Sequence, residues 1–199
     1  MTTKIQADVI GHTTLILILG SWFAFALIFL LRKKPPKFEE VKQASVARWG
    51  ILLQAAGFGL VWSFRRPQWW PFPSNVGGEI ILSTVAVVLA WVSNWWCLRS
   101  VQTLGKQWTV QARILKGHEL ITDGPYGIVR NPIYLGMFGL LVATGLALSS
   151  WWAQLGAVVV FLIGNRIRIG AEEKLLRESF GSQFVKYAER VPAFMPRIF

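Results

Sequence analysis

The sequence predicts an all-α integral membrane protein with about five transmembrane helices, the last two of which form a helical hairpin. The first observation behind this prediction is composition, because 53% of the 199 residues are hydrophobic and 11 are tryptophan. Soluble domains usually contain roughly 45–50% apolar residues, even with glycine counted. The positions of the apolar stretches and of the basic residues are the second and third observations, and they predict the helices and their orientation.

Five apolar stretches predict the spanning helices. They cover residues 9–31, 49–64, 80–98, 133–148 and 151–163. The first and third approach the ~20 residues that a helix needs to cross the bilayer core, whereas the others need flanking residues or a thin local bilayer. Only the break "LALSSWWAQ" separates the last two stretches, so we expect these two to form the hairpin.

The basic residues predict the orientation of these helices. All but three of the 21 lysine and arginine residues fall on one side if the five stretches cross alternately, and the positive-inside rule places that side in the cytoplasm. The N-terminus is then outside and the C-terminus cytoplasmic. A prokaryotic plasma membrane suits this compact chain, with the endoplasmic reticulum as the alternative. We expect the first stretch to be retained rather than cleaved as a signal peptide, because "FLLRKKPP" offers no small-residue cleavage site.

The same sequence disfavours several classes of function. The net charge of +11 is spread along the chain rather than gathered in one domain, which argues against nucleic-acid binding. His118 has no partner at metal-ligand spacing, so no metal site is expected. The connections between the stretches are too short for a separate soluble domain. We therefore expect one membrane domain over residues 1–199, surrounded by lipid and without an obligate protein partner, whose chemistry occurs at the cytoplasmic membrane face.

Polar residues that could perform this chemistry gather in three predicted cytoplasmic segments. These are residues 104–120, the stretch "DGPYGIVRNPIYLGMFGLL" at 123–141, and residues 165–187. Within the last segment, Arg168 and Glu172 are four residues apart and share a helix face directly after the fifth stretch. Ionisable side chains near membrane depth are costly and tend to mark a binding cavity. The residues alone therefore predict a polar cytoplasmic pocket without identifying the reaction.

The order and spacing of the motifs in these segments resemble those of a known family. The pattern Gln111 … HELI … GPY … RNPIY … EE … FG … Y, within residues 104–187, is similar to that of the isoprenylcysteine carboxyl methyltransferases and, more loosely, of the phospholipid methyltransferases. The resemblance implies methyl transfer from the cofactor S-adenosylmethionine to a lipophilic acceptor that enters from the bilayer. It implies a catalytic half at 101–199, whereas residues 1–100, with transmembrane helices one to three, share only the hydropathy of the family.

The resemblance further implies roles for individual residues. The cofactor pocket would be formed by the loop after the third span and the C-terminal helix. Arg168 would face the methyl acceptor as a catalytic and substrate-binding residue, and Arg130, also assigned to catalysis, would fix the pocket or an anionic group. Cofactor-binding roles fall on Gln111, His118, Glu119, Leu120, Ile121, Tyr126, Asn131, Pro132, Ile133, Tyr134 and Glu172.

Asn131 departs from the family pattern, in which a histidine precedes the proline. Asparagine donates and accepts hydrogen bonds but cannot titrate near neutral pH, so an orienting role survives this exchange and a proton-transferring role does not. Two other interpretations stay open. One is an NADPH-dependent sterol-type reductase, against which Ile133 and the run "LGMFGLL" argue. The other is a non-enzymatic membrane protein derived from the family, for which Asn131 is the best support.

Overall fold

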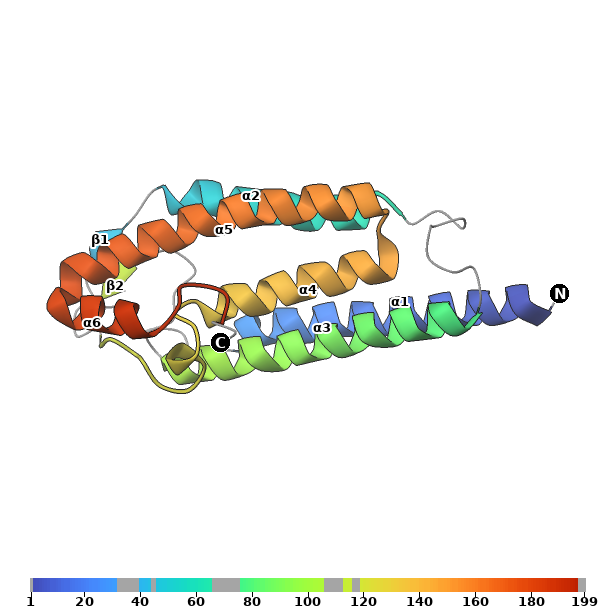
Figure 1. Cartoon of the computed structure of the whole chain (residues 1–199), viewed down its shortest axis with the longest axis horizontal. Coiled ribbons are helices and arrows are strands. Elements are labelled where there is room, and N and C mark those ends of the chain that lie inside the picture. The colour runs from blue at the N-terminus through green and yellow to red at the C-terminus, as the bar shows by residue number, and fades with distance from the viewer. Residues whose placement is uncertain are drawn as a thin grey trace.

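The computed structural model of the chain describes residues 2–31, 40–43, 46–65, 76–105, 113–115 and 119–196. Long helices make up most of this described part (Figure 1). The helices are α1 (Thr2–Leu30), α2 (Ala47–Ser63), α3 (Val76–Leu104), α4 (Pro132–Leu148), α5 (Trp151–Phe180) and α6 (Ser182–Arg190). The other elements are a short sheet of β1 (Glu40–Gln43) and β2 (Arg113–Leu115) and a 3₁₀ turn at Gly124–Gly127.

The five predicted apolar stretches coincide, to within one residue at their ends, with parts of the helices α1 to α5, so their helical character is confirmed. Within the described residues, three helices are long and apolar enough to cross a membrane. These are α1 from Asp8 onward, α3 and α5, and α4 is a shorter apolar helix. Helices of this length and composition indicate a membrane protein. The number of five spans stays a prediction.

Helix α5 is much longer than the predicted stretch 151–163, because it continues to Phe180 over 30 residues. At about 1.5 Å per residue its length is about 45 Å, which exceeds the ~30 Å of a bilayer core. Hydropathy falls after residue 163, but residues 171–176 (AEEKLL) are good helix formers and contain no proline. The helix ends at Gly181, whose φ of 51° suits glycine. Arg168 and Glu172 therefore lie on a rigid continuation of the apolar helix.

A two-stranded antiparallel sheet departs from the all-α prediction. Strands β1 and β2 pair with Glu40 opposite Leu115 and Gln43 opposite Arg113, and the register is irregular between Glu40 and Lys42. The sheet ties the segment after α1 to the segment after α3 and lies at the same end of the bundle as α6 (Figure 1). Strands of three or four residues are too short to show the alternation of apolar and polar residues by which a strand is predicted.

Small residues bring neighbouring helices close together. A Cβ atom on Gly50 of α2 would lie 2.6 Å from the carbonyl oxygen of Gly164 of α5, and a Cβ on Gly164 would lie 2.7 Å from the carbonyl oxygen of Gly50. Between α3 and α4, a Cβ on Gly136 would lie 3.0 Å from the carbonyl oxygen of Ser93 and would clash with the sulfur of Cys97. Such contacts favour helix association in membranes, where backbones can approach only through small side chains.

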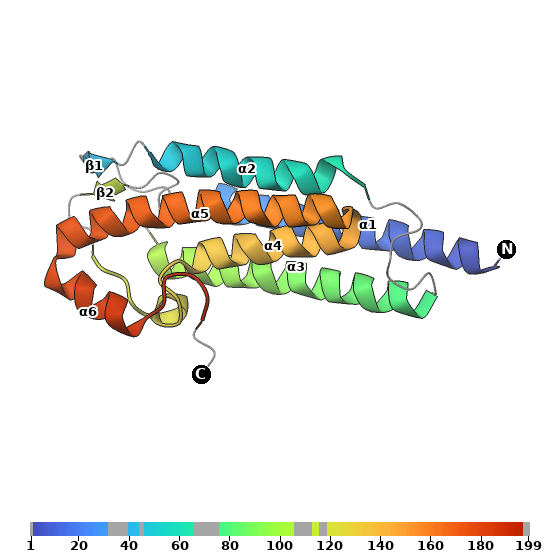
Figure 2. The same ribbon diagram turned by 45° about the horizontal axis from the view of Figure 1, so that its top comes forward.

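Helix α4 packs against both halves of the bundle (Figure 2). One buried apolar cluster joins it to α1 and α3 and includes Ile18 and Leu140. A second cluster joins it to α2 and α5 and includes Leu141 and Phe161. The start of α4, the 3₁₀ turn and α6 all lie toward the end of the bundle opposite the N-terminus, and the chain after α6 returns toward the start of α4 (Figure 1). The packing of α4 thus places the RNPIY motif beside the C-terminal segment.

Candidate functional site

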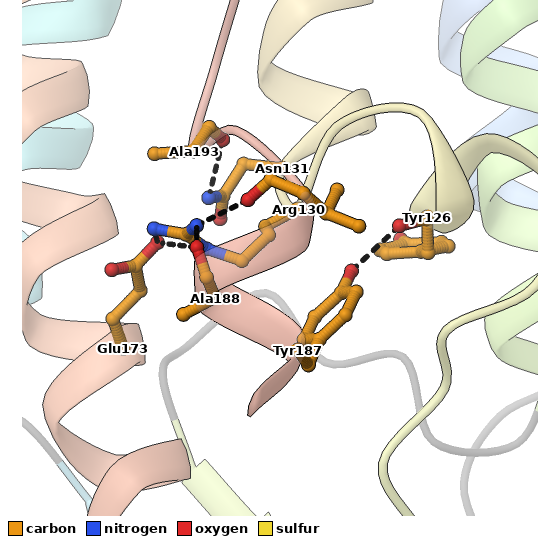
Figure 3. Close-up of polar contacts among 8 residues, drawn as sticks. Tyr126, Arg130, Asn131, Glu173, Tyr187, Ala188 and Ala193 are labelled. Atoms are coloured by element: carbon orange, nitrogen blue, oxygen red, sulfur yellow. Dashed lines mark hydrogen bonds and ion pairs between the residues drawn. The ribbon is translucent and has the colours of Figure 1, made fainter. Parts of the chain in front are cut away.

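The GPY motif forms the 3₁₀ turn Gly124–Gly127, which delivers Tyr126 into the protein. Gly124 has a φ of 56°, a conformation that glycine adopts without strain, and Pro125 occupies the start of the turn. Tyr126 is only 7% exposed. The hydroxyl of Tyr187 on α6 donates to the backbone carbonyl of Tyr126 at 2.7 Å (Figure 3). The turn is therefore attached directly to the C-terminal helix.

Arg130 binds the C-terminal segment through nearly all of its side-chain donors (Figure 3). Its Nε donates to Glu173 Oε1 at 2.8 Å, and Nη2 lies 2.8 Å from the same oxygen. Nη1 donates to the carbonyls of Ala188, at 2.8 Å, and of Val191. The backbone N–H of Arg130 donates to the carbonyl of Pro192 at 2.9 Å. This geometry makes Arg130 a brace between α4, α5 and the chain that follows α6, and its catalytic role stays a prediction.

Asn131 continues the same brace. Its Nδ2 donates to the carbonyl of Ala193 at 2.8 Å (Figure 3), and the residue is 9% exposed. Asn131 precedes the first residue of α4, Pro132, which is buried and loses nothing by lacking an N–H at this position. The contact with Ala193 needs a hydrogen-bond donor and no titrating group. The geometry is therefore compatible with an orienting role for Asn131.

Tyr134, Arg168 and Glu172 form a second polar cluster, one turn deeper along α4. The hydroxyl of Tyr134 donates to Glu172 Oε1, and Arg168 Nη2 lies 3.6 Å from the same oxygen. The guanidinium carbon of Arg168 lies 4.7 Å from the centre of the Tyr134 ring, within the range of a cation–π interaction. The Arg168 side chain is 9% exposed and that of Glu172 is 26% exposed. The structure thus brings together three predicted residues, and the carboxylate among them is partly exposed.

The far side of Arg168 contacts helix α2. Arg168 Nη1 donates to Gln54 Oε1 at 3.1 Å, and Gln54 Nε2 donates to Asn165 Oδ1 at 3.1 Å. Gln54 and Asn165 are each 2% exposed. The cluster around Arg168 therefore extends from α4 and α5 to a helix of the N-terminal half.

The other predicted residues are placed as follows. Ile133 is buried against Val101 of α3, Leu120 packs on the apolar cluster of α6, Ile121 is half-buried and Glu119 is exposed. Gln111 and His118 lie outside the described residues. In the part of the chain that the structure describes, no three histidine, cysteine, aspartate or glutamate side chains group as metal ligands would.

Burial also changes the acidity of the two phenols outside the spanning helices. Burial raises the pKa of Tyr126 well above its usual range, and the nearby Glu172 carboxylate raises it further. Burial raises the pKa of Tyr187 to about 12, although the Arg130 guanidinium works in the opposite direction. Both phenols therefore stay protonated near neutral pH and do not act as bases, and the Tyr187 hydroxyl is a hydrogen-bond donor.

Comparison with known proteins identifies the family of this site. The model of the phospholipid methyltransferase family matches residues 81–183, which is more than half of the chain. The chain belongs to the phospholipid methyltransferase family. The matched segment includes α4, most of α3, all of α5 and every predicted site residue, so the resemblance seen in the motifs is confirmed.

Relatives within this family carry two kinds of name. Protein-S-isoprenylcysteine O-methyltransferase B of Arabidopsis thaliana is 31% identical over 66% of this chain and 62% of the relative. Protein-S-isoprenylcysteine O-methyltransferase of Schizosaccharomyces pombe is 35% identical over 42% of this chain and 35% of the relative. The nickel-cobalt-cadmium resistance protein NccN of Alcaligenes xylosoxydans xylosoxydans is 32% identical over 50% of this chain and 46% of the relative. The chain thus spans less than two thirds of the length of each of these curated relatives.

Four residues that take part in the contacts described above are not among the site residues predicted from the sequence. Glu173 is the second member of the EE pair and Tyr187 is the last tyrosine of the motif pattern, so both were visible without an assigned role. Gln54 and Asn165 carry a weaker signal, an amide within or beside an apolar stretch. Gln54 also lies outside the segment matched by the phospholipid methyltransferase family.

Proposed function

We propose that the chain transfers a methyl group from S-adenosylmethionine to a lipophilic acceptor at the cytoplasmic membrane face, as in the isoprenylcysteine carboxyl methyltransferases. The observation that carries this proposal is the cluster of Tyr134, Arg168 and Glu172, which joins the RNPIY motif to the EE pair. Membership of the phospholipid methyltransferase family favours methyl transfer over NADPH-dependent reduction. The names of two relatives make a prenylated cysteine carboxylate the first acceptor to test.

The proposed membrane arrangement has five spans, formed by α1 to α4 and the first half of α5. The connection between α4 and α5 consists of Ser149 and Ser150, which supports a transmembrane hairpin. The basic residues support an outside N-terminus and a cytoplasmic C-terminus. A single domain over residues 1–199 would then hold its polar cluster at the cytoplasmic side of a prokaryotic plasma membrane or of the endoplasmic reticulum.

The side chains near the cluster suit S-adenosylmethionine, which carries hydroxyl and ammonium donors, an adenine ring and a sulfonium cation. The Glu172 carboxylate accepts hydrogen bonds from hydroxyl or ammonium groups and is 26% exposed. The rings of Tyr126 and Tyr134 are buried, at 7% and 6% exposed, and aromatic rings of this kind attract cations. We therefore assign Glu172, Tyr126 and Tyr134 to the cofactor pocket, with Asn131, Pro132 and Ile133 as its wall. Bound in this pocket, S-adenosylmethionine would supply an electrophilic methyl group.

The chain's own residues would contribute alignment and exclusion of water rather than proton transfer. Arg168 would hold an anionic acceptor through charge-assisted hydrogen bonds. The Tyr134 hydroxyl donates a hydrogen bond to the Glu172 carboxylate. This hydrogen bond fixes both side chains before an acceptor arrives. A carboxylate acceptor needs no base, so alignment in a dry pocket is the main requirement. A lipophilic acceptor would enter sideways from the bilayer, where its hydrocarbon chain remains in contact with lipid.

Calorimetry of the purified protein with S-adenosylhomocysteine and, separately, with NADPH tests the cofactor. We expect binding of S-adenosylhomocysteine alone, and binding of NADPH alone would replace the proposal with the reductase. Glu172→Gln should weaken S-adenosylhomocysteine binding about tenfold or more, because it removes charge-assisted hydrogen bonds. Glu178→Gln makes the same change at an exposed position of α5 and should leave affinity unchanged. Equal affinity in the two variants would refute the role of Glu172.

Transfer of a radiolabelled methyl group tests the acceptor. N-acetyl-S-farnesylcysteine, phosphatidylethanolamine and dodecanethiol represent a prenylated carboxylate, a phospholipid amine and a thiol. We expect label in the farnesylated carboxylate and a slower transfer in Arg168→Lys, since lysine cannot reproduce the planar fork of donors. Label in one of the other two acceptors would correct the substrate class. Binding of S-adenosylhomocysteine without transfer to any of them would favour the non-enzymatic interpretation.

A further inference from the structure

Helix α2 presents two residues to Arg168 on one face. Gly50 and Gln54 are four residues apart, which is about one helical turn, and both are buried against α5. A Cβ atom on Gly50 would collide with the Cγ atom of Arg168 and would lie 3.3 Å from the backbone nitrogen of Arg168. The missing side chain of Gly50 therefore provides the space through which the aliphatic part of Arg168 passes.

Gln54 then receives the guanidinium group at the end of that side chain. Its Oε1 accepts from Arg168 Nη1 at 3.1 Å, while its Nε2 donates to Asn165 Oδ1 at 3.1 Å. Asn165 lies three residues before Arg168 on α5, so both contacts of Gln54 reach the same helix. An amide whose oxygen and nitrogen are both bound cannot rotate without losing a buried hydrogen bond.

Three different groups thus fix the guanidinium plane of Arg168. Gln54 contacts Nη1, Glu172 lies 3.6 Å from Nη2, and the Tyr134 ring covers one face at 4.7 Å. Gln54 is the only one of the three that comes from the N-terminal half of the chain. Unlike the Glu172 carboxylate, the neutral amide of Gln54 holds the guanidinium without adding a negative charge beside it.

We propose that Gln54 is the positioning residue for Arg168, holding the guanidinium in the orientation that receives the anionic group of the acceptor. This inference rests on the proposed methyl transfer for its consequence, and on the contacts between Gln54, Arg168 and Asn165 for its geometry. Because Gln54 orients the Arg168 guanidinium before the acceptor binds, binding does not carry the entropic cost of ordering that side chain. Helix α2 is then part of the site, although the family match begins at residue 81.

Gln54→Leu tests the proposal, because leucine keeps the approximate volume and removes both hydrogen bonds. Gln154→Leu makes the same change near the start of α5, about four helical turns before Arg168, and serves as the matched control. The first readout is nuclear magnetic resonance of the protein labelled with isotopic arginine, in which Arg168→Lys identifies the Arg168 signals. We expect separate Nη signals for Arg168 in the unsubstituted protein and in Gln154→Leu, and merged signals in Gln54→Leu, where the guanidinium rotates.

The second readout is transfer to N-acetyl-S-farnesylcysteine. Gln54→Leu should lower kcat/KM for this acceptor roughly tenfold to a hundredfold, the range for a lost hydrogen bond to a charged group. Affinity for S-adenosylhomocysteine should stay within about twofold, which a merely structural defect would not allow. In an Arg168→Lys background the same substitution should change kcat/KM by less than about twofold, because the two residues act as one unit.

Unchanged Arg168 signals in Gln54→Leu, or an equal loss of transfer in the Arg168→Lys background, would overturn the proposal. If the unsubstituted protein transfers no methyl group, the proposed function fails while the resonance experiment still decides the positioning. If Gln54→Leu does not fold, Gln54→Glu replaces it. Glutamate retains an oxygen for Arg168 Nη1, so the Arg168 signals should stay separate, and their merging would contradict the proposal.

Discussion

Removal of the Arg130 guanidinium should release the C-terminal segment while leaving the helical bundle folded. Arg130→Met keeps much of the aliphatic length and removes every donor. In the structure these donors bind Glu173 and the carbonyls of Ala188 and Val191, so the substitution leaves a carboxylate and two carbonyls without this partner. Only the contacts between α4, α5 and the segment from α6 to the following chain are affected.

The expected loss of stability is large for a single contact site. The side chains of Arg130 and Glu173 are 12% and 19% exposed, and removing one partner of a buried ion pair costs about 3–5 kcal/mol. The two carbonyl contacts do not add their full value, because neighbouring interactions are not additive. Partial exposure of Glu173 lets water solvate the remaining carboxylate. We therefore expect about 3 kcal/mol, from the lower end of that range.

Hydrogen exchange followed by mass spectrometry measures this loss where it occurs. A change of about 3 kcal/mol should lower the protection of residues 182–193 by roughly a hundredfold, with little change in α1 and α3. Arg190→Met is the matched control, because Arg190 is exposed on α6 and its Nε donates to the carbonyl of Lys186, one turn before it. Protection of residues 182–193 within about threefold of the unsubstituted protein, together with lost S-adenosylhomocysteine binding, would refute the brace and support a direct role of Arg130 in binding.

Three further predictions concern other contacts of the site. Asn131→His should leave the pH dependence of methyl transfer without a new transition near the usual histidine pKa of about 6.5, and a new transition there in kcat would reveal a proton-transfer role at this position. Gly50→Ala should lower the free energy of unfolding by about 1–3 kcal/mol, because its Cβ would lie 2.6 Å from a carbonyl oxygen of α5. Gly59→Ala, which meets nothing within 4 Å, should be neutral or stabilising in the same denaturation assay. Tyr187→Phe should remove part of the alkaline loss of stability, since the folded pKa is about 12 and the unfolded pKa about 10. The unfolded state then loses its proton first, so stability falls from about pH 10 to 12 in the unsubstituted protein and falls less steeply in Tyr187→Phe; identical melting curves over this range would contradict the assignment.

Helices α1 to α5 could be predicted from the sequence because each contains an apolar run. A helix at Arg168 and Glu172 is also predicted, but its continuity with the fifth apolar stretch is not, because hydropathy falls after residue 163 while α5 continues to Phe180. The β1–β2 sheet could not be predicted, because its two strands are separated by about 70 residues in the sequence. Each strand also has only three or four residues, too few to show an alternating pattern. The continuation of α5 follows local helix propensity, whereas the sheet joins distant segments that local patterns do not relate.

The candidate site divides in the same way. Arg168 and Glu172 are predicted as neighbours because they are four residues apart on one helix. The contacts of Arg130 with Ala188 and of Asn131 with Ala193 join residues about sixty positions apart, and no spacing rule in a single sequence indicates them. Gln54 is 114 positions from Arg168. A lone amide in an apolar stretch signals a buried hydrogen bond without naming its partner.

The EE pair shows why the motif alone could not assign different roles to Glu172 and Glu173. Successive residues of an α-helix point about 100° apart, so Glu172 and Glu173 cannot serve the same neighbours. Glu172 contacts Tyr134 and Arg168, whereas Glu173 binds Arg130 and through it the chain after α6. One carboxylate therefore belongs to the cluster proposed for binding and transfer, and the other to the brace that closes the C-terminal segment over the start of α4. We therefore expect the loss of Glu172 to weaken cofactor binding and the loss of Glu173 to release the C-terminal segment, so the two adjacent carboxylates would act for different physical reasons.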